Sequence, residues 1–400
     1  MYLVLFCVLA GFTQLLTAQN KARVVVLTDI ENEPDDAQSM VRFLLYCNHY
    51  DVEGLIATTS THLRDTIAEW RIHEIVAAYG VVRDNLVLHE PGFPTADYLH
   101  SVVKHGIPKY GLDGVGPGMD SEGSEWLINV VDKEDKRPVW VSIWGGTNVL
   151  AQALWKVQQT RTPAQLQQFI SKLRVYTISD QDNSAHWIRT EFPGLFYIVS
   201  PGENYRHATW AGISGEPWYR FASGADTSIV KNPWLRKHII HNHGPLGAEY
   251  PEVEYAMGGD TPSFLSLINN GLNVPERPDF GGWGGRYEYY IPRFLTYRQN
   301  TDTRPEIHPI WTDADDEAIG KDGRIYIDNH ATIWRWRDAF QHDFAARMDW
   351  CLAGYQEANH PPTAKITRKN EITVQVGEWT ELDGSPSSDP DGDKLTFHWF

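Results

Sequence analysis

The sequence predicts an α/β protein of the doubly wound class, built on a mostly parallel sheet. Apolar runs rich in β-branched residues alternate with helical patterns along most of the 400 residues. The runs are apolar at nearly every position, which is typical of parallel strands covered by helices on both faces. Polar residues follow several of the runs directly. Because ligands bind beyond the carboxyl ends of the strands in such sheets, we expect a site along that edge.

The expected elements follow from these patterns in chain order. The runs predicted to form strands are RVVVLT (23–28), VEGLIATTS (52–60), NLVLHE (85–90), RPVWVSIW (137–144), LRVYTIS (173–179) and LFYIVS (195–200). After the first run, Ala37, Met40, Val41, Leu44 and Leu45 have the spacing of a helix with one buried face. Further helices are predicted at 64–79, stopping at Gly80, and at 148–159 and 332–355.

The two ends of the chain differ in composition from the middle. Residues 1–19 are predicted to be a secretory signal peptide, because the apolar stretch is short for a membrane span and Ala18 offers a small residue for cleavage. An uncleaved anchor is the alternative. The α/β domain is expected over 20–357. After a Pro-containing linker, residues 361–400 alternate like the start of an Ig-like β-sandwich that stops within a strand.

Charge and cysteine content narrow the classes of partner. The formal net charge is -17, which argues against binding to a nucleic-acid polymer or an anionic membrane surface. A cation and a neutral substrate such as a sugar are compatible with it, and so is a homo-oligomer. We expect no stable membrane insertion after signal cleavage. Of the three cysteines, Cys7 would leave with the signal, and Cys47 and Cys351 are expected to be buried, unpaired thiols.

Five acidic residues crowd the junction between the first strand and the first helix. They are Asp29, Glu31, Glu33, Asp35 and Asp36. Acids in the first turn of a helix favour its positive end, but capping accounts for one or two carboxylates only. Clustered carboxylates are offset by a hard divalent cation, Ca²⁺ or Mg²⁺, which prefers oxygen ligands. The cluster therefore predicts a metal site.

Several motifs resemble a known family. TDIENEPDDAQS (28–39) resembles the D-x-D-P-G-x-D-D-A motif of the calcium-dependent nucleoside hydrolases. With EGLIATTS, SIWGGTNVLAQALW, ISDQDNSAHWIR, GGDTPSFL and ATIWRWRDAFQHDFAARMDW, it resembles more closely a nucleoside hydrolase-like family of secreted bacterial proteins, often labelled cellulose-binding, with a carboxy-terminal sandwich domain. The resemblance covers nearly the whole chain. It implies a nucleoside hydrolase-like fold, bound Ca²⁺ and a secreted or periplasmic location.

The resemblance also implies roles for individual residues. The metal ligands would be Asp29, Asp36, Asp260 and a backbone carbonyl at Trp144 or Gly145. Asp29 would serve as ligand or base, and Asp35 would face a sugar hydroxyl, so these two acids are the predicted catalytic residues. The candidate substrate-binding residues are Glu33, Asn148, Asp182, Asn183 and Glu191.

Two departures from the nucleoside hydrolase pattern bear on the chemistry. Gly259 stands where those enzymes have a His before the late Asp, so protonation of a nucleobase at this position is in doubt. Pro193 replaces the Asn of the sugar-binding E-F-N step. The predicted activity is hydrolysis of N- or O-glycosyl bonds in a sugar-containing small molecule or oligosaccharide, as in the N-ribosylhydrolases. The alternative is a non-catalytic protein that binds cellulose or another polysaccharide.

Other patterns are weaker signals of function. Residues 313–324 begin like an EF-hand loop but have Ala318 where Gly is required, so a solvated loop is expected. DPDGD (389–393) fits either a second calcium site or a turn. DIEN (29–32) lacks the second Asp of a haloacid dehalogenase-type phosphatase.

Histidine and tryptophan residues offer further candidates for ligand binding. His238, His241 and His243 lie close in sequence but lack a zinc-protease frame, and we expect a packing role for that loop. Of the 16 tryptophans, Trp144, Trp187 and Trp283 are candidates for stacking on sugar rings.

Overall fold

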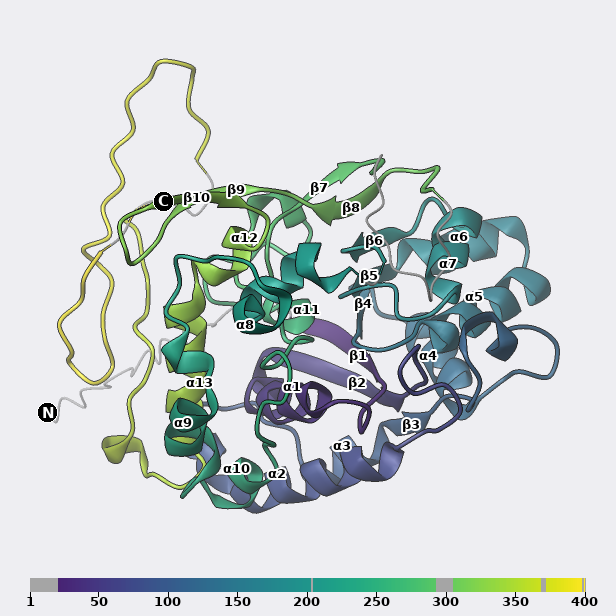
Figure 1. Cartoon of the computed structure of the whole chain (residues 1–400), viewed down its shortest axis with the longest axis horizontal. Coiled ribbons are helices and arrows are strands. Elements are labelled where there is room, and N and C mark those ends of the chain that lie inside the picture. The colour runs from purple at the N-terminus through teal and green to yellow at the C-terminus, as the bar shows by residue number, and fades with distance from the viewer. Residues whose placement is uncertain (1–20, 203, 293–304, 368–371, 398, 400) are drawn as a thin grey trace, which may run out of the picture.

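A computed structural model describes residues 21–202, 204–292, 305–367, 372–397 and 399. Its main feature is an eight-stranded sheet in the order β3-β2-β1-β4-β5-β6-β8-β7 (Figure 1). The sheet is parallel from β3 to β8, and β7 runs antiparallel to β8. This is the mostly parallel α/β architecture that the sequence predicts. The predicted signal peptide lies outside the described residues.

The bounds of the elements are as follows. The strands are β1 Ala22–Thr28, β2 Tyr50–Ala57, β3 Val103–His105, β4 Val139–Ile143, β5 Leu173–Thr177, β6 Phe196–Val199, β7 Tyr287–Tyr290, β8 Ile310–Asp313, β9 Asp316–Ile319 and β10 Ile325–Asp328. The helices are α1 Pro34–Leu45, α2 Glu69–His89, α3 Ala96–Ser101, α4 Glu122–Asp132, α5 Asn148–Thr160, α6 Pro163–Ser171, α7 Ser184–Glu191, α8 Glu216–Tyr219, α9 Asn232–Leu235, α10 Gly244–Ala248, α11 Pro262–Leu265, α12 Ala331–Trp334 and α13 Arg337–Asp349.

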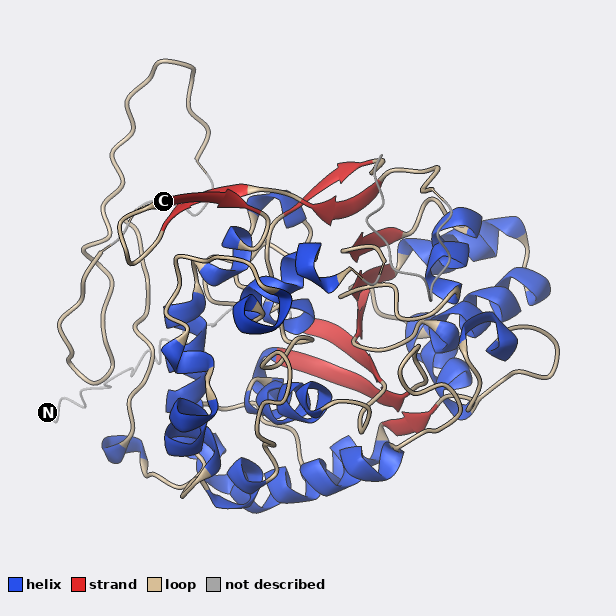
Figure 2. Cartoon of the chain, viewed as in Figure 1, coloured by secondary structure: helices blue, strands red, loops and turns tan. Residues whose placement is uncertain are grey.

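Each face of the sheet packs against its own set of helices. Successive side chains of a strand point to opposite faces, so Val24 and Val26 of β1 enter one core while Val25 and Leu27 enter the other. Helices α1, α2 and α13 cover the first face, and α4 to α7 cover the second (Figures 1 and 2). Both faces of β1 are apolar because both are buried.

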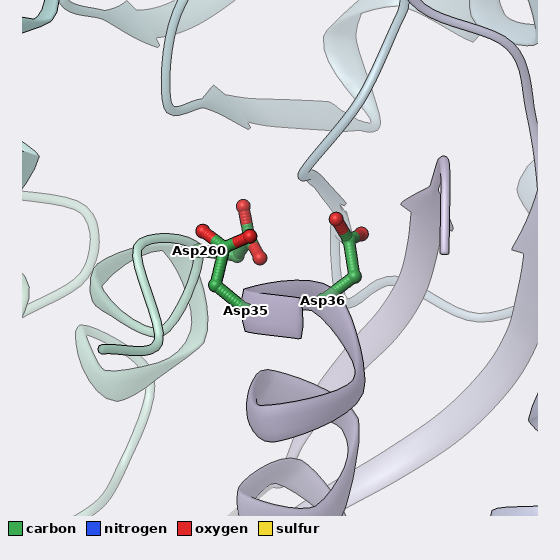
Figure 3. Close-up of side chains that lie close together, drawn as sticks. All are labelled: Asp35, Asp36 and Asp260. Carbon is green, nitrogen blue, oxygen red and sulfur yellow. The ribbon is translucent and has the colours of Figure 1, made fainter. Parts of the chain in front are cut away.

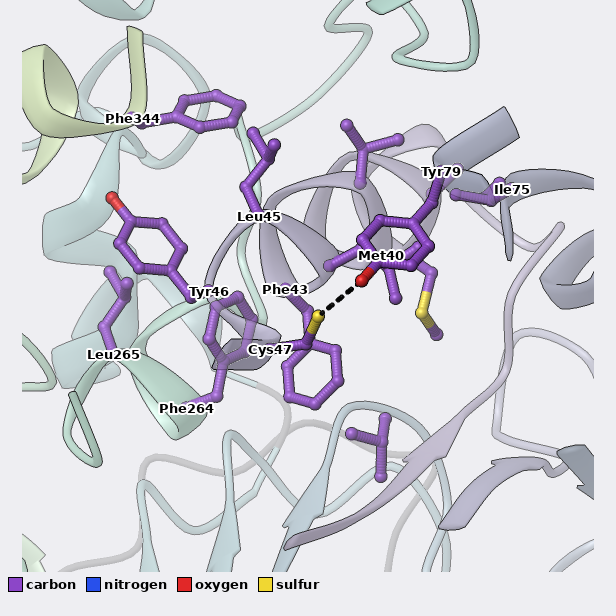
Figure 4. Packing of buried hydrophobic residues seen from close by; sticks show 14 of the residues in the cluster. Met40, Phe43, Leu45, Tyr46, Cys47, Ile75, Tyr79, Phe264, Leu265 and Phe344 are labelled. Atoms are coloured by element: carbon purple, nitrogen blue, oxygen red, sulfur yellow. Dashed lines mark hydrogen bonds between the residues drawn. The ribbon is translucent and has the colours of Figure 1, made fainter. Parts of the chain in front are cut away.

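Helix α1 is buried more completely than a single apolar stripe predicts. Every residue from Asp36 to Leu45 is buried, including Arg42, whose guanidinium donates to the Phe340 carbonyl and lies over the Phe344 ring. Helices α2 and α13 close over its outer surface, and Figure 4 shows the resulting core. The start of α1 is thereby fixed against the end of β1.

Helix α2 corrects two sequence expectations. It continues through Gly80 to His89, so NLVLHE (85–90) forms the last turns of this helix and not a strand. Gly80 does not end the helix. A Cβ at that position would lie 2.9 Å from the Cβ of Ala96, so the glycine lets α2 and α3 pack closely. The edge of the sheet is formed instead by the short strand β3, which the apolar pattern does not reveal.

Two later segments also differ from, or extend, the expectations. Residues 313–324 hold the end of β8, strand β9 and the exposed turn that precedes β10, so the expected solvated loop is correct for the turn only. The helix expected at 332–355 is α12 followed by α13. Cys47 and Cys351 are buried and free, as predicted; the Cys47 thiol donates to the Tyr79 hydroxyl (Figure 4).

The segment after α13 is tied to the α/β domain by a pair of histidines. His89 at the end of α2 contacts His360 through ring nitrogens 2.9 Å apart, and the other His360 nitrogen lies 2.9 Å from the Asp391 carboxylate. Asp391 therefore belongs to a turn in DPDGD that holds His360. The described residues beyond His360 form one isolated bridge, Thr363 to Ser388, and no strand, so the β-sandwich stays a prediction. Within the described residues, no helix combines the length and apolar character that crossing a membrane requires.

Candidate metal and substrate site

The acid-rich segment is a tight turn at the carboxyl edge of the sheet. Asp29 directly follows β1, and its carbonyl accepts a hydrogen bond from the Asn32 amide. Glu31 takes a left-handed backbone conformation, with φ of 76°, and Pro34 then begins α1. Because of this turn, the acids do not all point to the same place: Asp29 and Glu33 line one pocket. Glu31 points away from the other acids and pairs with Arg71 at 3.0 Å.

Three carboxylates from distant parts of the chain converge beyond this edge. Asp35 and Asp36 lie in the first turn of α1, and Asp260 lies just before α11 (Figure 3). Each offers an oxygen, and the three oxygens lie within 4.8 Å of one another. The α11 segment reaches them because Phe264 and Leu265 pack in the core beside α1 (Figure 4).

Asp29 lies beside this group and has no hydrogen-bond partner for either carboxylate oxygen. Its exposed fraction is 1%, and Asp260, at 2%, also has one oxygen without a partner. Buried polar atoms in proteins are nearly always hydrogen-bonded, so each exception needs a specific reason. Unpaired carboxylate oxygens gathered in a buried site match the ligand set of a hard divalent cation. The residues therefore fit Ca²⁺.

Glycine at position 145 is what allows Asp29 to occupy this place. A Cβ there would lie 2.5 Å from Asp29 Oδ1, so any other residue would displace the carboxylate. The same holds for Gly259, where a Cβ would lie 2.7 Å from Asp35 Oδ2 and 3.0 Å from the Trp210 ring. Both glycines thus make room for acids of the site.

The electrostatics of the site reflect acids that lack counter-charges. Burial raises the pKa of Asp29 and of Glu33. Burial, reinforced by the negative charges of neighbouring acids, raises the pKa of Asp36 and of Asp260 well above the usual range. For Asp35, burial and then the charges of Glu33 and Asp29 raise the pKa to about 8. A cation among these groups would favour their charged forms.

The acids line a pocket whose other side is aromatic. The space between its walls is about 340 Å³ when the part open to solvent is counted. Its lining residues are Asp29, Asn32, Glu33, Asp35, Asp36, His62, Ile178, Gln181, Tyr205, Trp210, Tyr219 and Asp260. The Trp210 ring lies 5.3 Å from that of Tyr205 and 5.7 Å from that of Tyr219, in edge-to-face contacts. An acidic side facing an aromatic wall can hold a sugar by its hydroxyls and its ring face.

Sequence reasoning missed the aromatic side of the pocket. Tyr205, Trp210 and Tyr219 belong to short helical turns after β6, and His62 belongs to the loop after β2. These segments carry no spacing signature. The one signal in the sequence was the high tryptophan count, and a count does not indicate which tryptophan lines a pocket.

The tryptophans named from the sequence do not line the pocket. Trp144 is fully buried among Phe43 and Phe264, so the expectation that its ring stacks on a sugar is wrong. Trp283 is 9% exposed and belongs to the same core, and Trp187 packs on Phe192. The Trp144 carbonyl accepts a hydrogen bond of 2.6 Å from Gln181, a lining residue, so its role as a ligand stays a prediction.

Four of the predicted substrate-binding residues lie outside the pocket lining, and three of them have structural contacts. Asn148 bonds to Thr58, Thr59 and the Lys109 carbonyl, and Asp182 accepts five hydrogen bonds from the starts of α5 and α7. The side-chain oxygen of Asn183 accepts from the Leu112 amide. Glu191 is exposed at the end of α7. Only Glu33 of this set lines the pocket.

Other candidate metal sites are not supported. Among the described residues, Asp35, Asp36 and Asp260 form the one cluster of potential ligands found. His243 pairs with Asp349 at 3.0 Å, which matches the packing role expected for its loop.

Comparisons with known proteins agree with this fold. Residues 23–287 match the family model described as cellulose-binding Sde182, nucleoside hydrolase-like domain. A nucleoside hydrolase-related hypothetical protein from Saccharophagus degradans, described as associated with carbohydrate metabolism, is 38% identical, with a TM-score of 0.73 over 94% of this chain and 84% of that chain.

A more distant solved structure is also similar to the chain. The structure of an inosine-uridine preferring nucleoside hydrolase from Bacillus anthracis is 12% identical, with a TM-score of 0.38 over 80% of this chain and 99% of that chain. None of the curated proteins matches the chain. The family model spans well over half of the chain, and the Saccharophagus protein resembles it over nearly its full length. The chain therefore belongs to the cellulose-binding Sde182, nucleoside hydrolase-like family.

Proposed function

We propose that the protein is a secreted or periplasmic, Ca²⁺-dependent hydrolase of N- or O-glycosyl bonds in a sugar-containing small molecule or oligosaccharide. One observation carries the proposal. Asp29 and Asp260 bury carboxylate oxygens that have no hydrogen-bond partner, beside Asp35 and Asp36 in a pocket with an aromatic wall. A pocket of this kind needs a cation to be stable when ionised, and it places carboxylates where a sugar would enter.

The residues divide into those that would hold the cation and those that would act on the substrate. Asp29, Asp36 and Asp260 would hold Ca²⁺, with the Trp144 carbonyl as a further candidate. The cation would neutralise these acids and help to acidify a neighbouring water. Asp35 would orient that water or a sugar hydroxyl and accept its proton, as a carboxylate base does. Glu33 would bind a further hydroxyl.

The aromatic wall has a separate part in the proposal. Trp210 is buried, and its indole N–H donates to Ser179 at 2.9 Å, which fixes the ring plane. A fixed ring can stack on a sugar and exclude water from the bond that breaks. The transition state of glycosyl transfer is oxocarbenium-like, so nearby carboxylates would stabilise its positive charge.

A second candidate is a carbohydrate-binding protein without turnover. The aromatic wall favours it, because ring stacking serves binding as well as catalysis, and the family description contains the word cellulose-binding. The two candidates differ in what the acids do. Binding alone does not require Asp35 beside a cation.

The test is to load chelator-stripped protein with Ca²⁺ and incubate it with nucleosides and with plant and algal oligosaccharides, with products read by mass spectrometry. We expect cleavage by the wild type and a loss of about 10²–10⁴-fold in rate for Asp35→Asn. Glu31→Gln is the matched control, because Glu31 belongs to the same acidic turn but pairs with Arg71 outside the pocket. Retained ligand binding without any cleavage by the wild type would favour the binding protein.

A further inference from the structure

Cleavage of a glycosyl bond needs a proton for the leaving group as well as an attacking water. The acids of the pocket come from the turn after β1 and from the starts of α1 and α11. Position 259, directly before Asp260, cannot carry a proton donor, because a Cβ there would meet the Asp35 carboxylate and the Trp210 ring. A donor for the leaving group must therefore come from another part of the pocket.

His62 and Tyr205 meet at the lining of the same pocket. The Nε2 atom of His62 lies 3.0 Å from the Tyr205 hydroxyl, a hydrogen-bond distance. His62 comes from the loop after β2 and Tyr205 from a turn after β6, and both line the pocket. His62 is exposed and Tyr205 is half-buried against Trp210. The pair therefore connects solvent with the interior of the pocket.

The loop of His62 holds the imidazole near the acids of the pocket without an ion pair among the described residues. No carboxylate in the described part of the chain forms an ion pair with it. It nevertheless lies near enough to Asp29 and Glu33 that, while burial raises the pKa of both acids, a positive charge on His62 opposes the rise. The loop is fixed by Ser60, whose hydroxyl accepts from the backbone amides of His62 and Leu63. The imidazole is thus held near the acids without being locked to one of them.

We propose that His62 and Tyr205 form a proton relay that protonates the leaving group, which extends the proposed function and rests on it. The Tyr205 hydroxyl gives its proton to the leaving-group oxygen or nitrogen as the bond to the anomeric carbon breaks. The protonated His62 returns a proton from Nε2 to the Tyr205 oxygen, so no phenolate builds up. The attacking water loses its proton to Asp35. Asp35 then releases its proton to solvent and His62 regains one, so the balance is one water consumed per bond cleaved.

A proton relay matters for one class of substrate in particular. The alkoxide of a sugar hydroxyl is a poor leaving group and needs protonation, whereas 4-nitrophenolate leaves without it. The proposal therefore predicts that the natural leaving group is of the unactivated kind, such as a sugar or alkyl hydroxyl.

The experiment compares 4-nitrophenyl and methyl glycosides of a sugar that the wild type releases. We expect His62→Gln and Tyr205→Phe to lower the rate on the methyl glycoside by about 10²–10⁴-fold while changing the rate on the nitrophenyl glycoside only a few-fold. His73→Gln is the matched control, because His73 pairs with His100 outside the pocket and should leave both rates unchanged. Calcium uptake by each variant, read by calorimetry, reports that the acid site is intact.

Each outcome decides between the ideas. Equal losses on both glycosides would mean that the pair acts in binding or structure and would overturn the relay. Unchanged rates in both variants would also overturn it. If the wild type cleaves neither glycoside nor any other sugar substrate while binding Ca²⁺, the proposed hydrolase function fails first, and the relay fails with it.

Discussion

Asp182 and Asp29 are both buried aspartates at the carboxyl edge of the same sheet, yet their surroundings are opposite. Asp182 follows β5 and accepts five hydrogen bonds, from Thr147, Asn148 and Ser184. Asp29 follows β1 and accepts none at its carboxylate. Asp182 thus joins the first turns of α5 and α7 to each other. Beside Asp29 lies the Ser60 hydroxyl, which lowers the pKa of the carboxyl against the larger effect of burial.

The difference separates an acid that stabilises the fold from an acid whose oxygens are left free to bind a ligand. A buried carboxylate whose lone pairs are satisfied contributes to the fold, because removing it leaves several donors unpaired. A buried carboxylate without partners costs free energy in the folded protein unless something binds it. Both acids lie in motifs that resemble the family, so the motif alone does not distinguish them. Their hydrogen bonds do.

The largest expected effect is on calcium uptake. Asp36→Ala removes one of the three converging carboxylates, and we expect calorimetry of chelator-stripped protein to show no uptake. Glu31→Gln should bind Ca²⁺ as the wild type does. Undiminished uptake by Asp36→Ala would mean that the cation, if any, lies elsewhere.

The second prediction concerns Asp182→Ala, which removes the hydrogen-bonded aspartate. We expect the free energy of unfolding to fall by about 3 kcal/mol or more, because three buried backbone amides lose their acceptor. Urea denaturation of the calcium-free protein measures this. Calcium uptake by the protein that remains folded should persist. A variant of wild-type stability that no longer binds Ca²⁺ would reverse the assignment of the two acids.

A pair of neighbouring glycines sharpens the comparison without removing any charge. In Gly145→Ala the new Cβ meets Asp29, and we expect calcium affinity to fall by about 10–100-fold, as for a strained, overpacked site. In Gly146→Ala the Cβ would lie 2.4 Å from the Thr59 carbonyl oxygen and 2.5 Å from Asp182, so stability should fall instead. Identical behaviour of the two variants in calorimetry and thermal unfolding would contradict this division.

A further expected effect is a pH dependence of stability that calcium removes. The pKa of Asp35 is raised to about 8 in the folded protein, so the folded state holds a proton that the unfolded chain has released. Stability of the calcium-free protein should therefore fall as pH rises from about 4 towards 8. Scanning calorimetry should show a lower Tm at higher pH and a larger rise in Tm on adding Ca²⁺ there. A Tm that rises over this interval in calcium-free protein would contradict the prediction.

Much of the fold was predictable because continuous apolar strands and amphipathic helices report burial directly. NLVLHE was misassigned because a short apolar run has no period that separates a strand from the end of a helix. Family motifs and the geometry of parallel sheets predicted that Asp29, Asp36 and Asp260 converge. The structure groups Asp35 with Asp36 and Asp260, and Asp29 lies beside them. Their roles as ligands and base remain predictions.

The rest of the site was beyond sequence reasoning for a physical reason. Which side of a turn a side chain occupies depends on the packing of the elements around it. Asn148 was expected to face substrate, but three partners on neighbouring loops hold it in the scaffold. His62 and Tyr205 lie 143 positions apart in segments without a pattern, and only the folded chain brings them together.

The histidine pair at the end of the α/β domain makes the segment after α13 part of one continuous set of polar contacts. His89 contacts the Ala353 carbonyl at one end of this set, and His360 contacts the Asp391 carboxylate at the other. Burial lowers the pKa of His89, and the hydrogen bonds with His360 lower the pKa of Asp391. The two rings meet in the middle, with nitrogens 2.9 Å apart. The attachment of the following segment therefore depends on one imidazole from each side, and loss of either ring breaks the connection.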